Sequence, residues 1–374
     1  MQNCKGNLSV YIQVNLRILC RNGGIMEFIT EKEKSLQEYL PELTKEPDFD
    51  TFWTDTLTEA REHPLNFHCR PVSYPAKYLK LYDIDYEGMD GTVIHGWYME
   101  PNFTQEAADN SVPETFHSSD TPSDAPLDMP SDKSGKFPCL VNFHGFSGDR
   151  GQPHDFFLWV MAGMAVLTVD CREQGGSTGS SYAYGSTGII NNVTTKGLMD
   201  PKEYYYRYAY TDCLRALDVA CQIPSVDKDR LVVHGISQGG GIGTAVCALD
   251  HRPCAALLDV PSCADLPKRV WGEYGAFSAV ADYLRKYPFR IEQAMKTLSY
   301  FDTMNHAEHI TCPVYASVAL KDNICPAECF FAAYNRITAP KQITIYPFNG
   351  HDGARHIHWQ KKLEYLQNIG IIDR

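Results

Sequence analysis

Gly235-Ile236-Ser237-Gln238-Gly239 is the stretch that decides the fold of this 374-residue chain. It follows the short apolar run Leu231-Val232-Val233 and leads into residues 241–246, whose small and apolar side chains predict a helix. A strand that turns into a helix through G-x-S-x-G carries its serine on a sharp turn, because small neighbours let strand and helix approach each other. We therefore expect Ser237 to be a nucleophile; the alternative is a purely structural turn.

Apolar runs on both sides of this stretch predict a mostly parallel sheet. The runs that suit buried strands are 139–143, 165–169, 231–233, 255–258, 314–318 and 342–346. Helical stretches separate them, which predicts an α/β fold with helices on both faces of the sheet. Upstream, residues 78–86 and 92–99 alternate apolar and polar side chains around a Gly-Met-Asp-Gly turn, the pattern of an antiparallel hairpin. This order, with the serine turn, is typical of the α/β-hydrolase fold.

Three segments depart from the strand–helix pattern. Residues 1–25 make a poor secretory signal, so we expect a non-structural extension, a working protein that begins near Met26, and a single domain over 26–374. Thr30-Glu31-Lys32-Glu33 is a capping-box pattern that predicts the start of a helix. Residues 103–136, rich in Ser, Thr, Pro and Asp, predict a disordered insertion, a tolerated loop rather than a partner tether. Residues 263–305 carry aromatic-rich helical patterns and predict a cap that shapes access to the serine.

Composition restricts the possible partners. The formal net charge of −12 argues against nucleic acid and anionic membranes, because both bind basic surfaces. The sequence has no run of 18 apolar residues, so nothing in it predicts a membrane span. Its 13 cysteines form no C-x-x-C pair and no metal-ligand spacing, which indicates reduced thiols in a cytoplasmic protein. We expect neither a metal nor an organic cofactor.

A serine nucleophile needs a histidine base and an orienting carboxylate, which follow it in this fold in the order acid, then histidine. His351 lies in an Asn-Gly-His-Asp-Gly loop between the last strand and the last helix, and is the expected base. Asp322 follows the strand 314–318 and is the expected acid. Its rival is Asp259, at the end of the preceding strand.

Two backbone N–H groups should hold the oxyanion that forms during attack. One belongs to Gln238, the residue after the nucleophile, and the other comes from a loop after an early strand. His144-Gly145-Phe146 closes the strand 139–143, which makes the Phe146 amide the expected second donor. The alternative for this turn is ordinary loop geometry.

Several further stretches carry a resemblance to a known family. They are Asp48-Phe49-Asp50-Thr51-Phe52-Trp53, His144-Gly145-Phe146, Glu203-Tyr204-Tyr205-Tyr206-Arg207, Gly235-Ile236-Ser237-Gln238-Gly239-Gly240, Leu298-Ser299-Tyr300-Phe301-Asp302 and Asp322-Asn323-Ile324-Cys325-Pro326. Through them the chain resembles the acetyl xylan esterase / cephalosporin C deacetylase group, carbohydrate esterase family seven, over roughly residues 27–372. The resemblance implies serine hydrolysis of acetyl esters on short xylo-oligosaccharides and on cephalosporin C. It also implies an intracellular hexamer.

Carried over to this sequence, the family's triad falls on Ser237, Asp322 and His351, and its oxyanion donors fall on Gln238 and Phe146. The family has tyrosine at the Phe146 position, so a backbone donor is retained and any role of a hydroxyl is lost. Its His-Glu pair reads His351-Asp352 here, which is one methylene shorter.

Two other family motifs also differ in this chain. The Arg-Gly-Gln motif reads Arg172-Glu173-Gln174, and for Arg172 and Gln174 we favour a structural brace over direct contact with substrate. A Pro-Tyr pair of the cap reads Ala276-Phe277, which we expect to enlarge or reshape the acyl pocket. The aromatic run 204–208 is expected to be core and subunit packing rather than a sugar platform.

Together these patterns predict a cytoplasmic, homo-oligomeric serine esterase that removes acetyl groups from small carbohydrate esters. One alternative is a hydrolase of the same fold with another specificity, such as a longer-chain esterase or a peptidase. The other is a catalytically silent scaffold, in which Glu173 disturbs the alignment of the site.

Overall fold

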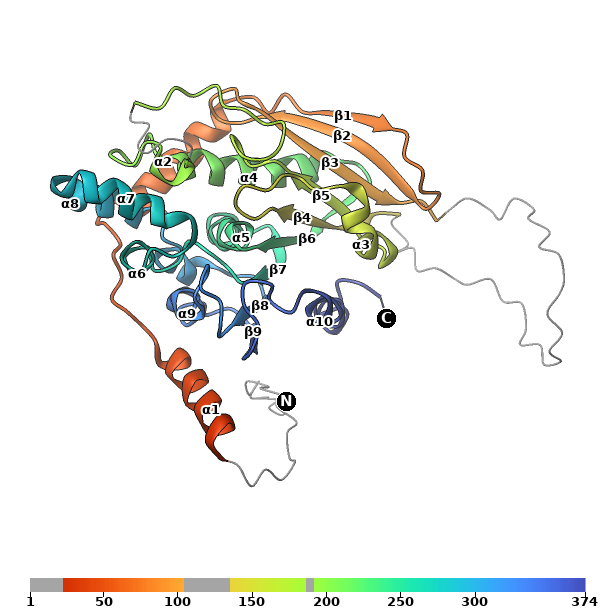
Figure 1. Ribbon diagram of the computed structural model, residues 1–374. Coiled ribbons are helices and arrows are strands. Elements are labelled where there is room, and N and C mark those ends of the chain that lie inside the picture. Colours follow the sequence, from red (N-terminus) through yellow and green to blue (C-terminus); the bar gives the residue numbers. More distant parts are fainter. Residues whose placement is uncertain (1–22, 104–134, 186–191, 374) are drawn as a thin grey trace, which may run out of the picture.

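A computed structural model describes residues 23–103, 135–185 and 192–373, and in these residues nine strands form one sheet (Figure 1). The strands are β1 (His68–Val72), β2 (Leu79–Glu87), β3 (Val93–Pro101), β4 (Phe137–Phe143), β5 (Ala165–Val169), β6 (Val226–Ile236), β7 (Pro253–Asp259), β8 (Val314–Ala319) and β9 (Lys341–Tyr346). Their order is β1-β2-β3-β5-β4-β6-β7-β8-β9. The pairs from β1 to β5 are antiparallel, whereas all pairs from β5 to β9 are parallel, which confirms the predicted mostly parallel sheet.

Helices cover both faces of this sheet. They are α1 (Gly23–Glu38), α2 (Phe49–Glu62), α3 (Phe157–Met161), α4 (Tyr205–Gln222), α5 (Gln238–Leu249), α6 (Leu266–Trp271), α7 (Ser278–Lys286), α8 (Ile291–Ser299), α9 (Ala327–Tyr334) and α10 (Arg355–Asn368). Short 3-10 turns lie at Pro153–Phe156, Val193–Thr195, Gly275–Phe277, Pro288–Arg290, Thr303–Asn305 and Ala307–His309. No helix among the described residues is long and apolar enough to cross a membrane.

The two-residue period of the strands divides the core next to the sheet into two main clusters. On β4, Cys139 and Val141 belong to the cluster under α2, α4, α5 and α9, while Leu140 belongs to the cluster under α3 and α10. Both faces are apolar because both are covered, as expected for a parallel sheet.

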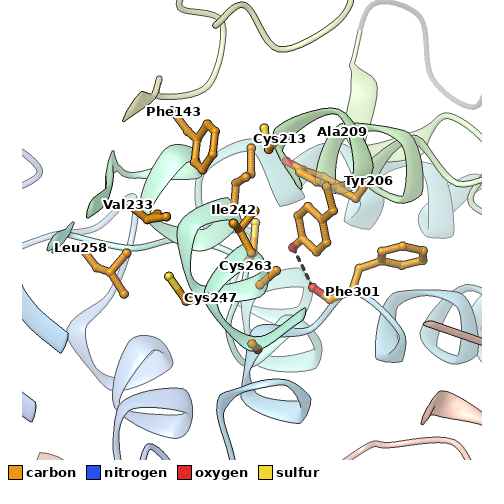
Figure 2. Close-up of a cluster of buried hydrophobic side chains, with 14 of the residues drawn as sticks. Phe143, Tyr206, Ala209, Cys213, Val233, Ile242, Cys247, Leu258, Cys263 and Phe301 are labelled. Atoms are coloured by element: carbon orange, nitrogen blue, oxygen red, sulfur yellow. Dashed lines mark hydrogen bonds between the residues drawn. The ribbon is translucent and has the colours of Figure 1, made fainter. Parts of the chain in front are cut away.

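The larger cluster lies where α4 and α5 meet the central strands (Figure 2). Figure 2 shows Phe143, Val233 and Leu258 on the strands, with Ile242 on α5 next to them. The tyrosines of the run 204–208 are buried, in agreement with core packing rather than an exposed sugar platform.

The N-terminal region differs from its sequence-based prediction. Helix α1 begins at Gly23 rather than at Thr30. Thr30 lies inside the helix, where its hydroxyl donates to the Met26 carbonyl at 2.8 Å instead of capping the first turn. Residues 23–25, expected to be non-structural, are therefore helical. The rest of the predicted extension lies outside the described residues, as does most of the predicted insertion 103–136.

Strand β1 was not predicted. All five of its side chains are exposed, so it lacks the apolar alternation that identifies a half-buried strand. It is defined by pairing with β2, where Arg70 contacts the carboxylates of Asp83 and Asp85.

Helices α6, α7 and α8 lie between β7 and β8, in the segment predicted to form a cap. The buried Asp302 carboxylate accepts hydrogen bonds from the backbone N–H groups of Asp265 at 2.9 Å and Leu266 at 2.6 Å. These bonds satisfy backbone groups at the start of α6, which would otherwise have no partner in the helix.

Candidate active site

Ser237 lies on the turn between β6 and α5 with φ of 59° and ψ of −118°. L-residues rarely adopt this conformation, and it persists only where the surroundings hold it. Three backbone hydrogen bonds do so here. The Ser237 N–H donates to the Asp259 carbonyl at 2.9 Å, and the Ser237 carbonyl accepts from the N–H groups of Gly241 at 3.0 Å and Ser262 at 2.9 Å.

The glycines on either side of Ser237 are required by close backbone contact. A Cβ atom on Gly239 would lie 1.9 Å from the Phe143 carbonyl oxygen, and one on Gly235 would lie 2.2 Å from the Gly239 carbonyl group. Any larger residue would push the helix away from the strands. The turn therefore needs glycine two residues before and two residues after the serine.

The side chains of Ser237, His351 and Asp322 form a continuous chain of hydrogen bonds. His351 Nε2 lies 3.0 Å from Ser237 Oγ, and His351 Nδ1 lies 2.8 Å from Asp322 Oδ2. The other carboxylate oxygen of Asp322 accepts the N–H groups of Ile324 and Cys325, each at 2.8 Å. The carboxylate thus favours the histidine tautomer with its proton on Nδ1, which leaves Nε2 free to accept the serine proton.

Asp259, the alternative acid, has ion-pair partners for its side chain on α10. Its carboxylate contacts Lys362 Nζ at 2.6 Å and His358 Nε2 at 3.0 Å, both on α10. Burial alone would raise the pKa of Asp259, but the Lys362 ammonium and the hydrogen bonds from His234 and His358 together outweigh it and hold this pKa well below its ordinary value. Asp259 therefore belongs to a buried ion pair beneath the serine turn and does not reach His351.

The two predicted oxyanion donors belong to segments that adjoin Ser237, one in the chain and one in space. Gln238 is the first residue of α5, so its N–H has no acceptor within the helix. A Cβ atom on Gly145 would lie 3.7 Å from Ser237 Cβ, which shows that the turn carrying Phe146 lies against the serine.

Gln174 connects these two backbone segments. Its Oε1 accepts the Ser147 N–H at 2.8 Å, and its Nε2 donates to Gln238 Oε1 at 3.1 Å and to the Tyr205 hydroxyl at 2.8 Å. Tyr206 donates its hydroxyl to the same Gln238 Oε1 at 3.1 Å. This network fixes the turn after β4 relative to the start of α5.

Arg172 lies beneath this network and is fully buried. Its guanidinium makes hydrogen bonds of 2.7 to 3.0 Å with the carboxylates of Asp212 and Asp90. Burial raises the pKa of Asp212 to about 6, and Arg172 opposes that rise. The Arg172 carbonyl accepts the Tyr205 hydroxyl at 2.7 Å, and Tyr205 accepts from Gln174, so the geometry agrees with a brace that acts on Gln174 through Tyr205.

The other residues that differ from the family pattern also have partners. Glu173 pairs with Lys196 at 2.6 Å, and both ring nitrogens of His351 contact other residues, Asp322 and Ser237. Asp352 accepts the Gly350 N–H at 3.1 Å, and its carboxylate shapes the loop that carries His351.

Ala276 and Phe277 lie in the 3-10 turn between α6 and α7. The Phe277 ring is buried and stacks on Tyr206, with ring centroids 6.3 Å apart and an interplanar angle of 15°. The Ala276 carbonyl accepts hydrogen bonds from Asn192 at 3.3 Å and Thr194 at 3.2 Å. Phe277 is therefore linked to the site indirectly: its ring packs on Tyr206, and Tyr206 is hydrogen-bonded to Gln238.

Two residues near the serine were missed by sequence reasoning. Cys325 Sγ lies 3.8 Å from Ser237 Oγ, and Arg269 on α6 donates to this sulfur at 3.6 Å. The position of Cys325, three residues after Asp322, could have indicated that it lies close to the site. No pattern in the sequence indicated this for Arg269. Within the described parts of the chain, no group of three or more His, Cys, Asp or Glu side chains could hold a metal ion.

A model of the acetyl xylan esterase (AXE1) family matches residues 26–117 and 115–369. The chain belongs to this family. Among solved members, it is 36% identical to an acetyl xylan esterase from Paenibacillus sp. R4, covering 90% of this chain and 98% of that one with a TM-score of 0.79. It is 30% identical to acetyl xylan esterase 1 from Thermoanaerobacterium sp. JW/SL YS485, covering 88% and 98% with a TM-score of 0.75.

The acetyl esterase Axe7A of Xylanibacter ruminicola is a curated relative of this chain. The two are 27% identical over 326 residues, or 84% of this chain. The match spans 65% of the relative's length, so that protein is substantially longer than the shared region. The predicted family and the α/β-hydrolase fold are thereby confirmed.

Proposed function

We propose that this protein is a serine esterase that removes acetyl groups from small carbohydrate esters. The observation that carries the proposal is the continuous hydrogen-bond chain from Asp322 through His351 to Ser237. Membership of the acetyl xylan esterase family supports acetyl as the acyl group and an acetylated xylo-oligosaccharide as the substrate.

In the first half of the proposed reaction, His351 Nε2 accepts the proton of Ser237 Oγ as the oxygen attacks the acetyl carbonyl. The tetrahedral oxyanion is held by the N–H groups of Phe146 and Gln238, each worth about 3 kcal/mol in the transition state. The C–O bond to the sugar then breaks, and His351 returns the proton to the leaving alcohol. Asp322 stays ionised and stabilises the imidazolium.

In the second half, His351 takes a proton from water, whose oxygen attacks the acetyl-serine. The bond to Ser237 Oγ breaks, the serine regains its proton from His351, and acetate leaves. Overall, one ester and one water give one alcohol, one acetate ion and one proton, and the proposed steps use no cofactor.

Three finer properties belong to the same proposal. We propose hydrolysis of cephalosporin C as a side activity, a cytoplasmic location, and assembly into a homo-hexamer, all of which rest on the family resemblance. The cysteines of the described residues are all free, which supports a reducing compartment. Trp271 and Phe289, with 89% and 78% of their surface exposed, support the burial of the cap against another subunit. Light scattering after gel filtration tests the hexamer.

The deciding experiment compares 4-nitrophenyl acetate, butyrate and octanoate with the wild type and Ser237→Ala. We expect turnover that prefers acetate and is abolished in the variant, whose circular dichroism and melting temperature stay near those of the wild type. Preference for octanoate would replace acetyl specificity with a longer-chain esterase. A wild type that neither hydrolyses acetate nor reacts with a serine-directed phosphonate would be a silent scaffold.

A further inference from the structure

Arg269, on α6, is a buried cation that has no carboxylate partner among the described residues. Its side chain is 1% exposed, and its Nη2 donates to the Ile324 carbonyl at 2.9 Å and to Cys325 Sγ at 3.6 Å. In the described part of the chain, Nε and Nη1 have no hydrogen-bond partner at all. A buried guanidinium left in this state is costly, because both charge and N–H groups have lost their contact with water.

The other buried arginines are compensated. Arg172 binds two aspartates, Arg207 binds the Glu59 carboxylate, and Arg215 donates to four backbone carbonyls. The fold therefore supplies partners to buried arginines elsewhere, and Arg269 is the exception among these four residues.

Arg269 is connected to the proposed nucleophile along two routes. On one side, successive contacts of 3.6 Å and 3.8 Å join Arg269 Nη2 through Cys325 Sγ to Ser237 Oγ. On the other side, the guanidinium carbon lies 5.6 Å from the centroid of the Phe277 ring, which stacks on Tyr206. Tyr206 in turn is bonded to the side chain of Gln238, next to the serine. The guanidinium, which no carboxylate among the described residues neutralises, thus lies one side chain away from the atom that attacks the ester.

We propose that Arg269 makes the acyl side of this site a binding site for a small carboxylate. Guanidinium N–H groups match carboxylate oxygens in geometry and charge, and a partly desolvated pair of this kind is strong. The carboxylate has two sources: acetate, the product of the proposed reaction, or a second carboxylate on the acyl group, as in a succinate monoester. In the latter case the ester bond alone reacts with water, and the second carboxylate is unchanged. The inference rests on the proposed function, since it assigns Ser237 as the nucleophile.

Binding is tested first in the Ser237→Ala background, which makes the result independent of activity. Acetate and succinate are titrated by calorimetry into Ser237→Ala and into Ser237→Ala with Arg269→Met. We expect at least one of the two anions to bind about tenfold more weakly when Arg269 is replaced. Arg285→Met, which removes an exposed arginine from α7 of the same cap, is the matched control and should leave affinity unchanged.

Kinetics then separate the two sources. Hydrolysis of monoethyl succinate and of ethyl butyrate, esters of equal acyl chain length, is followed by pH-stat. If the wild type prefers the succinate ester and Arg269→Met loses this preference, the carboxylate that Arg269 binds is part of the acyl group of the substrate. If there is no such preference, but acetate inhibits the wild type competitively and does not inhibit Arg269→Met, the bound carboxylate is the product acetate.

Equal affinity of both anions with and without the Arg269 guanidinium overturns the proposal, as does the absence of binding by either anion to Ser237→Ala. If Arg269→Met does not fold, Arg269→Gln replaces it, since it removes the positive charge and keeps a polar side chain. Unchanged binding and selectivity in that variant would overturn the proposal equally. An inactive wild type that nevertheless binds succinate through Arg269 would refute the esterase function and keep the anion site.

Discussion

Lys362→Met tests the buried ion pair that lies beneath the serine turn. Lys362 is 1% exposed on α10, and its Nζ contacts Asp259 Oδ2 at 2.6 Å and His234 Nε2 at 2.9 Å. Asp259 also holds the Ser237 N–H through its backbone carbonyl. The pair therefore ties the helix that follows the His351 loop to the strand that supports the serine.

The expected loss of unfolding free energy in Lys362→Met depends on the groups that still contact Asp259. Removing one partner of a buried ion pair costs about 3 to 5 kcal/mol, because the other charge is left buried. Since His358 at 3.0 Å and Ser317 at 3.2 Å still contact the carboxylate, we expect a loss near the lower limit, about 3 kcal/mol. For a chain of this size that corresponds to about 2 °C in melting temperature for each kcal/mol. Since the loop and the turn both depend on this pair, kcat should fall about tenfold with little change in KM.

Urea unfolding and steady-state kinetics measure these effects. Lys361→Met is the matched control, because Lys361 is the adjacent residue on α10 and is exposed; its stability should change by less than about 0.5 kcal/mol. Adding Asp259→Asn to Lys362→Met should recover about 1 to 2 kcal/mol, since it removes the unpaired charge. A loss no greater than that of Lys361→Met, or no recovery in the double variant, would refute the reasoning.

Three further predictions concern the site and its pH dependence. Asp322→Asn should lower kcat about 10⁴-fold, because an amide donates to His351 Nδ1 and favours the wrong tautomer; activity within tenfold of the wild type in an ester assay would contradict this. Gln174→Leu should lower kcat about tenfold to a hundredfold by releasing the turn after β4 from α5, and an effect confined to KM would argue for substrate contact instead. Burial lowers the pKa of His306 to about 3. Between about pH 6.5 and pH 3 the unfolded chain therefore binds a proton that the folded protein does not, and the free energy of unfolding falls as pH decreases through this range. In His306→Gln that slope should decrease by about 1.4 kcal/mol per pH unit between pH 6 and 4, and an unchanged slope in urea titrations would rule out a neutral His306.

The positions of the candidate catalytic residues could be predicted because parallel strands end at one edge of a sheet. Ser237, Asp322 and His351 each follow a strand that an apolar run identifies, so chain order alone brings them together. The same reasoning placed Asp259 at this edge. It could not show that the Asp259 side chain turns to α10, because that depends on how the helix is rotated against the sheet.

Residues that act from helices were beyond sequence reasoning. Lys361 and Lys362 are adjacent lysines, and nothing in the sequence indicates which of them is buried. Arg269 looked like any basic residue at the end of a short helix. Strand β1 is defined by its pairing with β2 and not by its own sequence. The start of α1 was predicted too late, because the capping pattern at Thr30 lies inside a helix that begins at Gly23.

The connection between β3 and β4 has a practical consequence for work with this enzyme. The Asn102 N–H is anchored to the Tyr78 carbonyl at 3.0 Å and the Phe137 N–H to the Ser225 carbonyl at 2.8 Å. Both anchors lie at the end of the sheet where the parallel strands begin, whereas Ser237 lies where β6 ends. The length of the strands separates these two anchors from the site, which makes this junction the place to attach a fluorescent reporter or an immobilisation tag.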